Sequence, residues 1–186
     1  MPATPRPKAA APLPARQASP HHQPCPGALT GFVFICPGRH EANRGYPCAA
    51  GTGANLNRVL AQLHTLAAQR FGSASRNDYV VTNAWPVVEY PALSGRSVPL
   101  ESEVLVADNL ARLAAELQGL RTVVACGQQA QAAVRALVAD GRLPAASVAV
   151  AYARHLSQRS VNMIPGASDT PGRIQRWCEG VATQLG

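Results

Sequence analysis

The chain has 186 residues and a formal net charge of +7, from 17 basic and 10 acidic residues. At this length we expect one domain and a tail, because most domains contain about 100–150 residues. The sequence lacks the run of about 18 apolar residues that a transmembrane helix needs, and prolines interrupt the place of a signal peptide's apolar core. These features argue against a membrane partner, and we expect a cytoplasmic monomer.

Arginine dominates the positive charge, since Lys8 is the one lysine among the basic residues. The guanidinium group binds phosphate through a planar fork, so this composition suits a polyanionic partner. High-GC coding also produces an Ala/Arg/Pro-rich sequence with little lysine, and composition alone leaves both explanations open.

Five cysteines are irregularly spaced, at positions 25, 36, 48, 126 and 178, and no Cys-x-x-Cys pair occurs. Zinc and iron–sulfur sites usually use such pairs. Cys36, His40 and Cys48 come nearest to a metal-binding set, but no second pair completes it. We therefore expect reduced cysteines, no metal and no organic cofactor.

The N-terminal 28 residues form a basic, Pro/Ala-rich stretch with little apolar surface. Such a composition does not offset the entropy lost on ordering the chain, so we expect residues 1–28 to be a disordered tail. Residues 29–186 would then form the folded domain.

Strand and helix patterns alternate along the folded part. Short apolar runs predict buried strands at residues 32–36, 79–83, 122–126 and 147–152. Apolar residues at helical spacing predict helices at residues 55–71, 101–120 and 128–138, and the capping sequence Asp169-Thr170-Pro171 predicts a last helix through Trp177. Alternating strands and helices pair in parallel through right-handed crossovers. The pattern therefore predicts an α/β fold: a three-layer α/β/α sandwich around a four-stranded parallel sheet.

Polar segments follow three of the predicted strands, at residues 34–41, 82–86 and 155–160. In open α/β sheets, ligands bind at loops that leave the carboxyl ends of the strands. Each segment alone is also typical of an ordinary connection, with Asn83 as a turn residue and His155 as a surface histidine.

Five motifs occur in a fixed order along the chain. They are Pro37-Gly38-x-x-Glu41 with Gly45-x-Pro47 and Gly53-x-x-Leu56-x-x-x-Leu60; Asn83 after a strand; Arg96, Pro99 and Glu101; Val123-Val124-Ala125-Cys126-Gly127-x-x-Ala130; and His155-x-Ser157-x-Arg159. The first resembles the first motif of the iron–sulfur-type uracil-DNA glycosylases. The last resembles the histidine loop of the single-strand-selective uracil glycosylases. Across residues 31–165 the chain is therefore similar to the uracil-DNA glycosylase superfamily.

The resemblance implies catalytic roles for three side chains. Asn83 would pair with the edge of a base flipped out of DNA, and His155 would stabilise the negative charge on the departing base. Glu41 is the nearest carboxylate that could position water. Alternatively, Glu41 pairs with Arg39 or Arg44, or it holds its own loop by hydrogen bonds.

The resemblance also implies a base pocket and DNA contacts. The pocket would be formed by Ile35, Cys36, Pro37, Gly38 and Cys48. Ser157 would contact a DNA phosphate, and Leu156 or Arg159 would fill the gap left by the flipped base.

The chain departs from the family pattern at several positions. Ile35 and Cys36 stand where relatives carry a Glu, Asp or Asn that orients water, and Cys48 stands where an aromatic residue usually stacks on the base. Ala107 lies near the place of a cluster cysteine, so we expect no iron–sulfur cluster. Leu156 replaces the proline that usually follows the histidine.

These observations predict a monofunctional DNA glycosylase that excises uracil or a related damaged base in DNA repair. A catalytically silent member that binds DNA or a free base is the alternative, supported by the missing water-orienting residue. A third possibility is an unrelated α/β domain for a small nucleotide, which requires that the motif loops do not converge.

Overall fold

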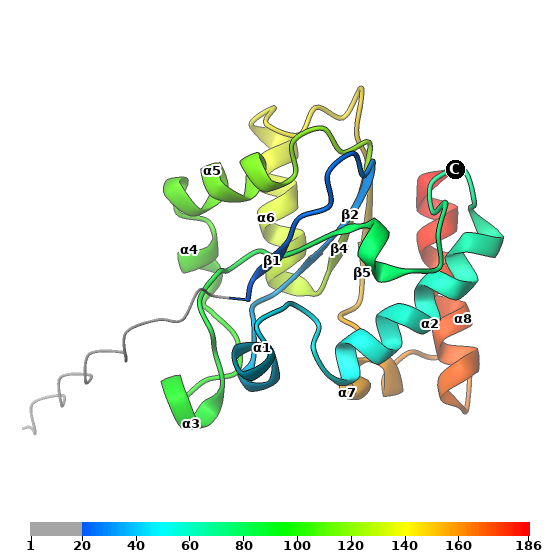
Figure 1. The fold of residues 1–186 in the computed structure, drawn as a ribbon, viewed down its shortest axis with the longest axis horizontal. Helices are drawn as coiled ribbons and strands as arrows, with labels where there is room; N and C mark the ends of the chain where they lie inside the picture. The colour runs from blue at the N-terminus through cyan, green and yellow to red at the C-terminus, as the bar shows by residue number, and fades with distance from the viewer. Residues whose placement is uncertain (1–19) are drawn as a thin grey trace, which may run out of the picture.

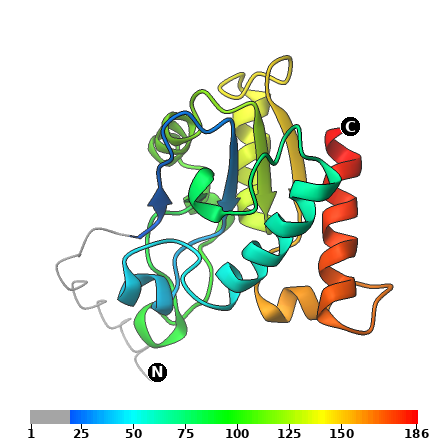
Figure 2. The same ribbon diagram turned by 45° about the vertical axis from the view of Figure 1, so that its right-hand side comes forward.

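A computed structural model describes residues 20–186 as a mixed α/β structure built on one sheet (Figures 1 and 2). Its strands are β1 (His22–Gln23), β2 (Thr30–Phe34), β3 (Val80–Asn83), β4 (Thr122–Cys126) and β5 (Ala149–Ala153). Their order across the sheet is β1-β3-β2-β4-β5, and only β1 runs antiparallel to its neighbour. The predicted four-stranded parallel sheet is confirmed, and β1 adds a fifth strand at its edge.

Helices cover both faces of this sheet (Figure 1). They are α1 (Arg39–Arg44), α2 (Gly51–Leu66), α3 (Pro91–Ser94), α4 (Glu101–Val104), α5 (Ala107–Glu116), α6 (Gln128–Ala139), α7 (Gln158–Asn162) and α8 (Thr170–Leu185), with a 3₁₀ turn, η1 (Arg76–Asp78). Among residues 20–186, no helix combines the length and apolar character that crossing a bilayer requires.

Alternating side chains of the strands divide the apolar core into two clusters. Phe32 and Phe34 point to the face covered by α2 and α8, whereas Val33 points to the face covered by α5 and α6. This is the two-residue period of a strand that is buried on both faces. The three-layer sandwich expected from the sequence is thereby confirmed.

The pairing of β2 with β3 continues beyond the strands as a ladder of backbone hydrogen bonds. Phe34 lies opposite Asn83, and the next amides donate to carbonyls of the neighbouring segment: Ala84 to Phe34 at 2.8 Å and Trp85 to Ile35 at 2.9 Å. The segments that leave β2 and β3 therefore run side by side past the carboxyl edge of the sheet.

Several element boundaries differ from the predicted ones. The helix expected at residues 101–120 is divided into α4 and α5. The cause is Asn109, whose amide nitrogen donates to the carbonyls of Val104 and Ala84, each at 2.7 Å. An asparagine side chain that bonds to the backbone in this way competes with continuous helix. The last helix also extends beyond Trp177 to Leu185.

Part of the expected tail belongs to the fold. Residues 22–23 form β1, which pairs with Val81 and Thr82 of β3. The expectation of disorder therefore does not hold for these residues, because β1 is ordered by the open edge of β3 rather than by an apolar core of its own. Residues 1–19 of the expected tail lie outside the described residues.

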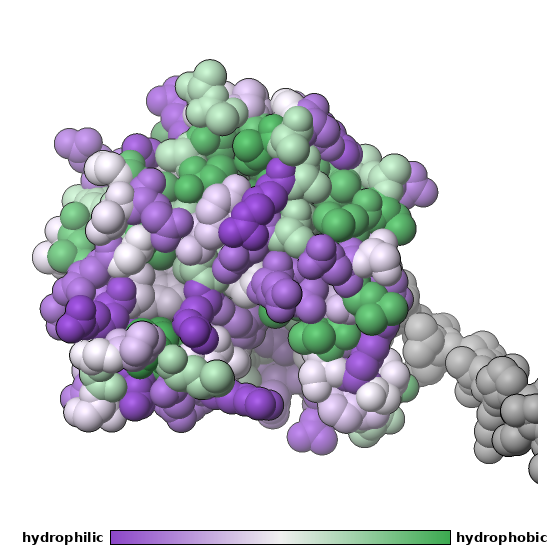
Figure 3. All heavy atoms as spheres, turned by 180° about the vertical axis from the view of Figure 1, so that it is seen from behind, coloured by the Kyte–Doolittle hydropathy of each residue, from purple (hydrophilic) through white to green (hydrophobic). Residues whose placement is uncertain are grey.

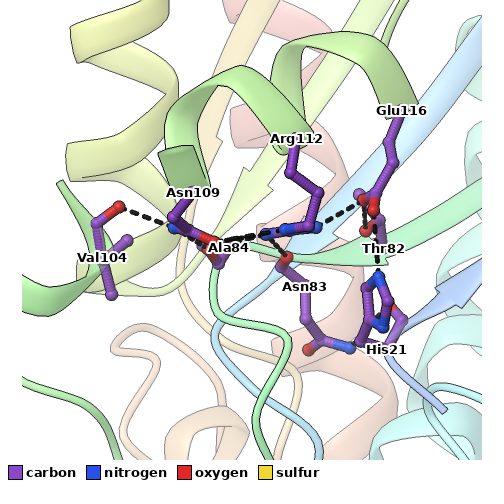
Figure 4. A network of polar contacts seen from close by, with 8 residues as sticks. All are labelled: His21, Thr82, Asn83, Ala84, Val104, Asn109, Arg112 and Glu116. Atoms are coloured by element: carbon purple, nitrogen blue, oxygen red, sulfur yellow. Dashed lines mark hydrogen bonds and ion pairs between the residues drawn. The ribbon is translucent and has the colours of Figure 1, made fainter. Parts of the chain in front are cut away.

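A polar network anchors the carboxyl end of β3 from α5 (Figure 4). Arg112 donates to the carbonyls of Asn83 at 3.0 Å and Ala84 at 3.1 Å, and it forms an ion pair with Glu116 at 2.6 Å. Glu116 also accepts a hydrogen bond from Thr82 at 2.5 Å and contacts the His21 imidazole at 2.9 Å. One carboxylate thus joins α5, β3 and the segment that enters β1.

We predict that Glu116→Gln destabilises the protein in a pH-dependent way. Burial raises the pKa of Glu116, but hydrogen bonds from His21, Thr82 and Arg112 outweigh burial and lower the pKa to about 2. The carboxylate therefore stabilises the fold fully above pH 4.5, and this stabilisation is lost as the pH falls toward 2. The substitution should lower the free energy of unfolding by about 2–3 kcal/mol at pH 7.

Urea denaturation at pH 7 and pH 3 measures this effect. Glu101→Gln is the control, because Glu101 is exposed at the start of α4, and it should change stability by less than about 0.5 kcal/mol. An equal loss for Glu116→Gln at both pH values would contradict the prediction.

Candidate functional site

The carboxyl edge of the sheet is hollowed. Figure 3 shows a recess at the lower edge of the molecule, between the lobe that carries α3 and the lobe that carries α7. The segments that leave β2, β3 and β5 all reach this edge, so the three polar segments singled out in the sequence come together here (Figure 2).

His155 is a neutral donor at this edge. Its Nδ1 accepts a hydrogen bond from the Ser157 backbone N–H at 3.0 Å, which places the ring proton on Nε2. Burial lowers the pKa of His155 to about 4, although the negative charge of Glu41 partly opposes this shift. At neutral pH, the imidazole therefore offers an uncharged Nε2–H.

The loop that carries His155 is fixed from two sides. Ser157 caps α7, its hydroxyl accepting a hydrogen bond from the Ser160 backbone N–H. Asn55 of α2 is completely buried, and its amide nitrogen donates to the Leu156 carbonyl at 2.9 Å. Sequence reasoning missed Asn55. The available signal was a polar residue beside the apolar positions of a predicted helix.

Asn83 and His155 lie on the same face of the sheet. Asn83 pairs in register with Phe34, whose ring packs edge-on against the His155 imidazole with centroids 5.6 Å apart. Because paired residues of parallel strands point to the same face, Phe34 stands between the asparagine and the histidine. The two side chains are thus brought to one edge, 72 positions apart in the chain.

The side-chain amide of Asn83 has a fixed orientation. Its nitrogen donates to the backbone carbonyl of His21 at 3.1 Å, and Figure 4 shows the side chain pointing toward that residue. A carbonyl only accepts hydrogen bonds, so the amide nitrogen must face His21 and the oxygen the other way. Only 2 % of Asn83 is exposed, so this oriented amide lies nearly buried at the edge of the sheet.

Glu41 holds its own loop. Its two carboxylate oxygens accept hydrogen bonds from the backbone amides of Gly38 at 3.0 Å and Ala49 at 3.1 Å. Arg44 donates to the Ala49 carbonyl. This is the loop-holding alternative considered from the sequence, and a role for Glu41 in positioning water stays a prediction.

The segment after β2 packs closely against the segment after β4. A Cβ added to Gly127 would lie 2.7 Å from Cδ1 of Ile35 and 3.3 Å from Cβ of His155, and Gly127 has a φ of +99°. Only glycine fits both the space and the backbone conformation. Ile35 therefore lies close to the histidine, and its part in a base pocket stays a prediction.

Cys36 and Pro37 face the segment that follows β3. The Cys36 thiol lies 3.7 Å from the Ser97 carbonyl, and the Pro37 carbonyl accepts a hydrogen bond from the Glu89 amide at 2.9 Å. Burial, reinforced by the charges of Glu89 and Glu41, raises the pKa of Cys36 to about 12. The thiol is therefore protonated at neutral pH.

Cys48 is placed below the site rather than on its surface. Its side chain is 5 % exposed within the apolar core, and its φ is +55°. Its carbonyl accepts a hydrogen bond from Arg76 at 2.8 Å, and a Cβ on Gly53 would lie 1.9 Å from that oxygen. Burial thus argues against stacking on a base. Gly53 belongs to the first motif, whereas the role of Arg76 in this loop was not predicted.

Leu156 and Arg159, the two residues considered for the gap left by a flipped base, lie in different environments. Leu156 is completely buried in the core, so in this conformation it does not fill a gap in DNA, contrary to the first of the two alternatives above. Arg159 is exposed on α7. The hydroxyl of Ser157 still has its hydrogen available for a phosphate oxygen.

A charged cluster that the sequence did not reveal lies beside Cys36. Arg96 forms ion pairs with Glu89 at 2.5 Å and with Glu103 at 2.6 Å. The motif identified in the sequence named Glu101, which is exposed, whereas Glu103 provides the carboxylate. Glu89 is only 4 % exposed. Within residues 20–186, no three His, Cys, Asp or Glu side chains are grouped so that they could hold a metal ion.

Comparison with known proteins agrees with this geometry. No curated protein matches the chain. A family model described as the Uracil DNA glycosylase superfamily matches residues 31–170, well over half of the chain. The matched region begins in β2 and ends at the start of α8, so it contains every strand-end segment of the candidate site. The chain belongs to the uracil-DNA glycosylase superfamily.

Proposed function

We propose that this protein is a monofunctional DNA glycosylase that hydrolyses the N-glycosidic bond of uracil or a related damaged base. The observation that carries the proposal is the neutral Nε2–H donor of His155, on the same sheet face and edge as the oriented amide of Asn83. Membership of the superfamily supports this type of chemistry.

Base recognition would rest on Asn83. A base inside a duplex is inaccessible, so the nucleotide must first rotate out of the stack into the recess. The amide oxygen of Asn83 would then accept the N3–H of uracil, and its second N–H would donate to O4. Cytosine has no hydrogen on N3 and carries an amino group at C4, so it offers the opposite pattern and is rejected.

Stabilisation of the leaving group would rest on His155. When the C1′–N1 bond breaks, its electron pair stays on the base, and the charge spreads onto the O2 oxygen. A preorganised hydrogen-bond donor at the developing oxyanion strongly stabilises the transition state in a site that excludes water. The Nε2–H supplies this donor while the ring stays uncharged.

DNA binding would use the exposed arginines around the recess. Arg39 lies on α1, Arg154 follows β5, and Arg159 lies on α7; all three side chains are exposed. Their guanidinium groups suit the phosphates on both sides of a flipped nucleotide. Because Leu156 is buried, we assign the gap left by the base to Arg159.

A catalytically silent DNA-binding or base-binding protein is the second candidate. It is favoured by the side chains of Ile35 and Cys36, which offer no carboxylate, and by Glu41, whose oxygens bond to backbone amides. A protein that shifts uracil-containing DNA in a gel but releases no base would establish this second function.

The first test is the excision of uracil from single- and double-stranded oligonucleotides. We expect release by the wild type, and a single-turnover rate lower by about 100- to 1000-fold for His155→Ala, because the oxyanion donor is lost. DNA affinity should change less than about threefold, because the Nε2–H acts on the departing base rather than on the phosphates. His64→Ala, in α2 away from the recess, is the control and should keep the wild-type rate.

The second test concerns the charge of His155. Because the ring is buried, we expect the pKa of His155 to be about 4. NMR titration measures it, and the His155→Gln variant identifies the His155 signal by its loss. Since this pKa lies below the ordinary 6.5, the folded state binds fewer protons than the unfolded state between these values. Stability should therefore fall as the pH drops from 6.5 toward 4, and less so in the variant. A titration at or above 6.5 would refute the neutral-donor role.

The third test concerns base readout. Asn83→Ala removes both hydrogen-bonding groups, so the excision rate for uracil should fall by about 10- to 100-fold. Asn77→Ala, at an exposed position of η1, is the matched control and should have no effect. Full activity of the Asn83 variant would dismiss the assignment.

A further inference from the structure

The proposed hydrolysis needs a group that orients a water molecule and accepts its proton. His155 does not serve, because its Nδ1 already accepts the Ser157 amide and Nε2 carries the proton. Glu41 is engaged through both oxygens with backbone amides. The Cys36 thiol is protonated, since burial raises its pKa to about 12.

Resting on the proposed function, we propose that Glu89, together with the indole N–H of Trp85, holds the attacking water. Both residues lie in the segment after β3, which runs beside the segment after β2. The Glu89 amide donates to the Pro37 carbonyl at 2.9 Å, and the Trp85 amide donates to the Ile35 carbonyl at 2.9 Å. Backbone pairing thus fixes these residues against the floor of the predicted base pocket.

The two oxygens of Glu89 have different environments. Oε1 is bound by Arg96 at 2.5 Å, whereas Oε2 is buried and makes no hydrogen bond within the described residues. The indole nitrogen of Trp85 is likewise buried without a hydrogen-bond partner there. Burying a polar atom without a partner is costly, so an unpaired acceptor near an unpaired donor indicates a site for a small polar ligand.

Water matches this donor and acceptor. One water hydrogen would be donated to Oε2 of Glu89, and one lone pair would accept the Trp85 N–H. The second lone pair stays free to attack carbon. A bound water usually needs two to four polar partners, and this site supplies two before substrate enters.

Glu89 has the charge that this role needs. Burial raises its pKa, but the hydrogen bond and charge of Arg96 outweigh burial, and the pKa lies below its ordinary value. Glu89 is therefore ionised at neutral pH. The side chains of Ser94 and Trp85 lie within reach of this carboxylate, and both lower its pKa further. A buried anion here would in addition stabilise the positive charge that develops on the sugar.

The C1′–N1 bond breaks, and its electron pair leaves with the base, held by the His155 Nε2–H. The water oxygen bonds to C1′, and one of its protons passes to Oε2 of Glu89. Glu89 then loses this proton to solvent, and the base anion takes up a proton as it is released.

The test compares Glu89→Gln with Glu103→Gln. Both substitutions remove one of the two carboxylates that bind Arg96, so both perturb the ion-pair cluster. Only Glu89→Gln removes the proton acceptor, and it should lower the single-turnover excision rate by at least about 100-fold. Glu103→Gln should stay within about threefold of the wild type, because the oxygens of Glu103 are bound by Arg96 and the Leu100 backbone amide rather than left for a water molecule.

Binding is measured separately from chemistry. An oligonucleotide with 2′-fluoro-2′-deoxyuridine resists cleavage, because the fluorine destabilises the cationic sugar. Its affinity should be within about threefold of wild type for Glu89→Gln, since the lost interaction is made in the transition state. A merely structural role would weaken this binding along with the rate.

Trp85→Phe provides a second variant that leaves the Glu89–Arg96 ion pair intact. It should slow excision by about tenfold, because one of the two partners that orient the water is lost. If Glu89→Gln does not fold, an unchanged rate for Trp85→Phe would overturn the proposal. An active wild type with fully active Glu89→Gln overturns the role of Glu89 alone, whereas an inactive wild type overturns the proposed function as well.

Discussion

The backbone pairing between β2 and β3 is the constraint on which the site depends. It sets Phe34 opposite Asn83 and then continues past the strands, through the hydrogen bonds that Ala84, Trp85 and Glu89 donate to the neighbouring segment. Two loops that would otherwise be independent are thereby kept in register. A shift of one residue would exchange the side chains between the two faces of the sheet. The order Asn83, Phe34 and His155 across the edge would then be lost.

Charged and neutral side chains lie at different depths at this edge of the sheet. Arg39, Arg154 and Arg159 are exposed where phosphates would lie, while the interior holds an uncharged imidazole and a protonated thiol. Glu89, a buried carboxylate beside Cys36, is compensated by Arg96, which also pairs with Glu103. Positive charge outside and neutral donors inside suit a polyanion whose reacting group becomes negative only during the reaction.

The sequence was sufficient for the fold and for the loops that form the site, because strand runs, helical spacing and motif order are local patterns. Asn83 and His155 follow strands whose carboxyl ends must meet in a parallel sheet, so their shared edge was predictable. Burial was not. Leu156 and Cys48 look like surface residues of polar loops, but tertiary packing places both in the core. Asn55, Arg76 and Glu89 act through partners that are 28 to 101 positions distant or on a neighbouring loop, and no local pattern marks such pairs.

The short strand β1 has a consequence for how the chain can be shortened. Its two residues occupy the edge of β3, and the residue before them accepts the side-chain amide of Asn83. An uncovered strand edge is a template for pairing with another molecule. A version trimmed past Gln23 would therefore present a bare edge next to Asn83. Such a protein would self-associate through β3, and the Asn83 amide would lose the hydrogen bond to His21 that fixes its orientation. A trimmed protein used for crystallisation or assays should therefore begin no later than Pro20.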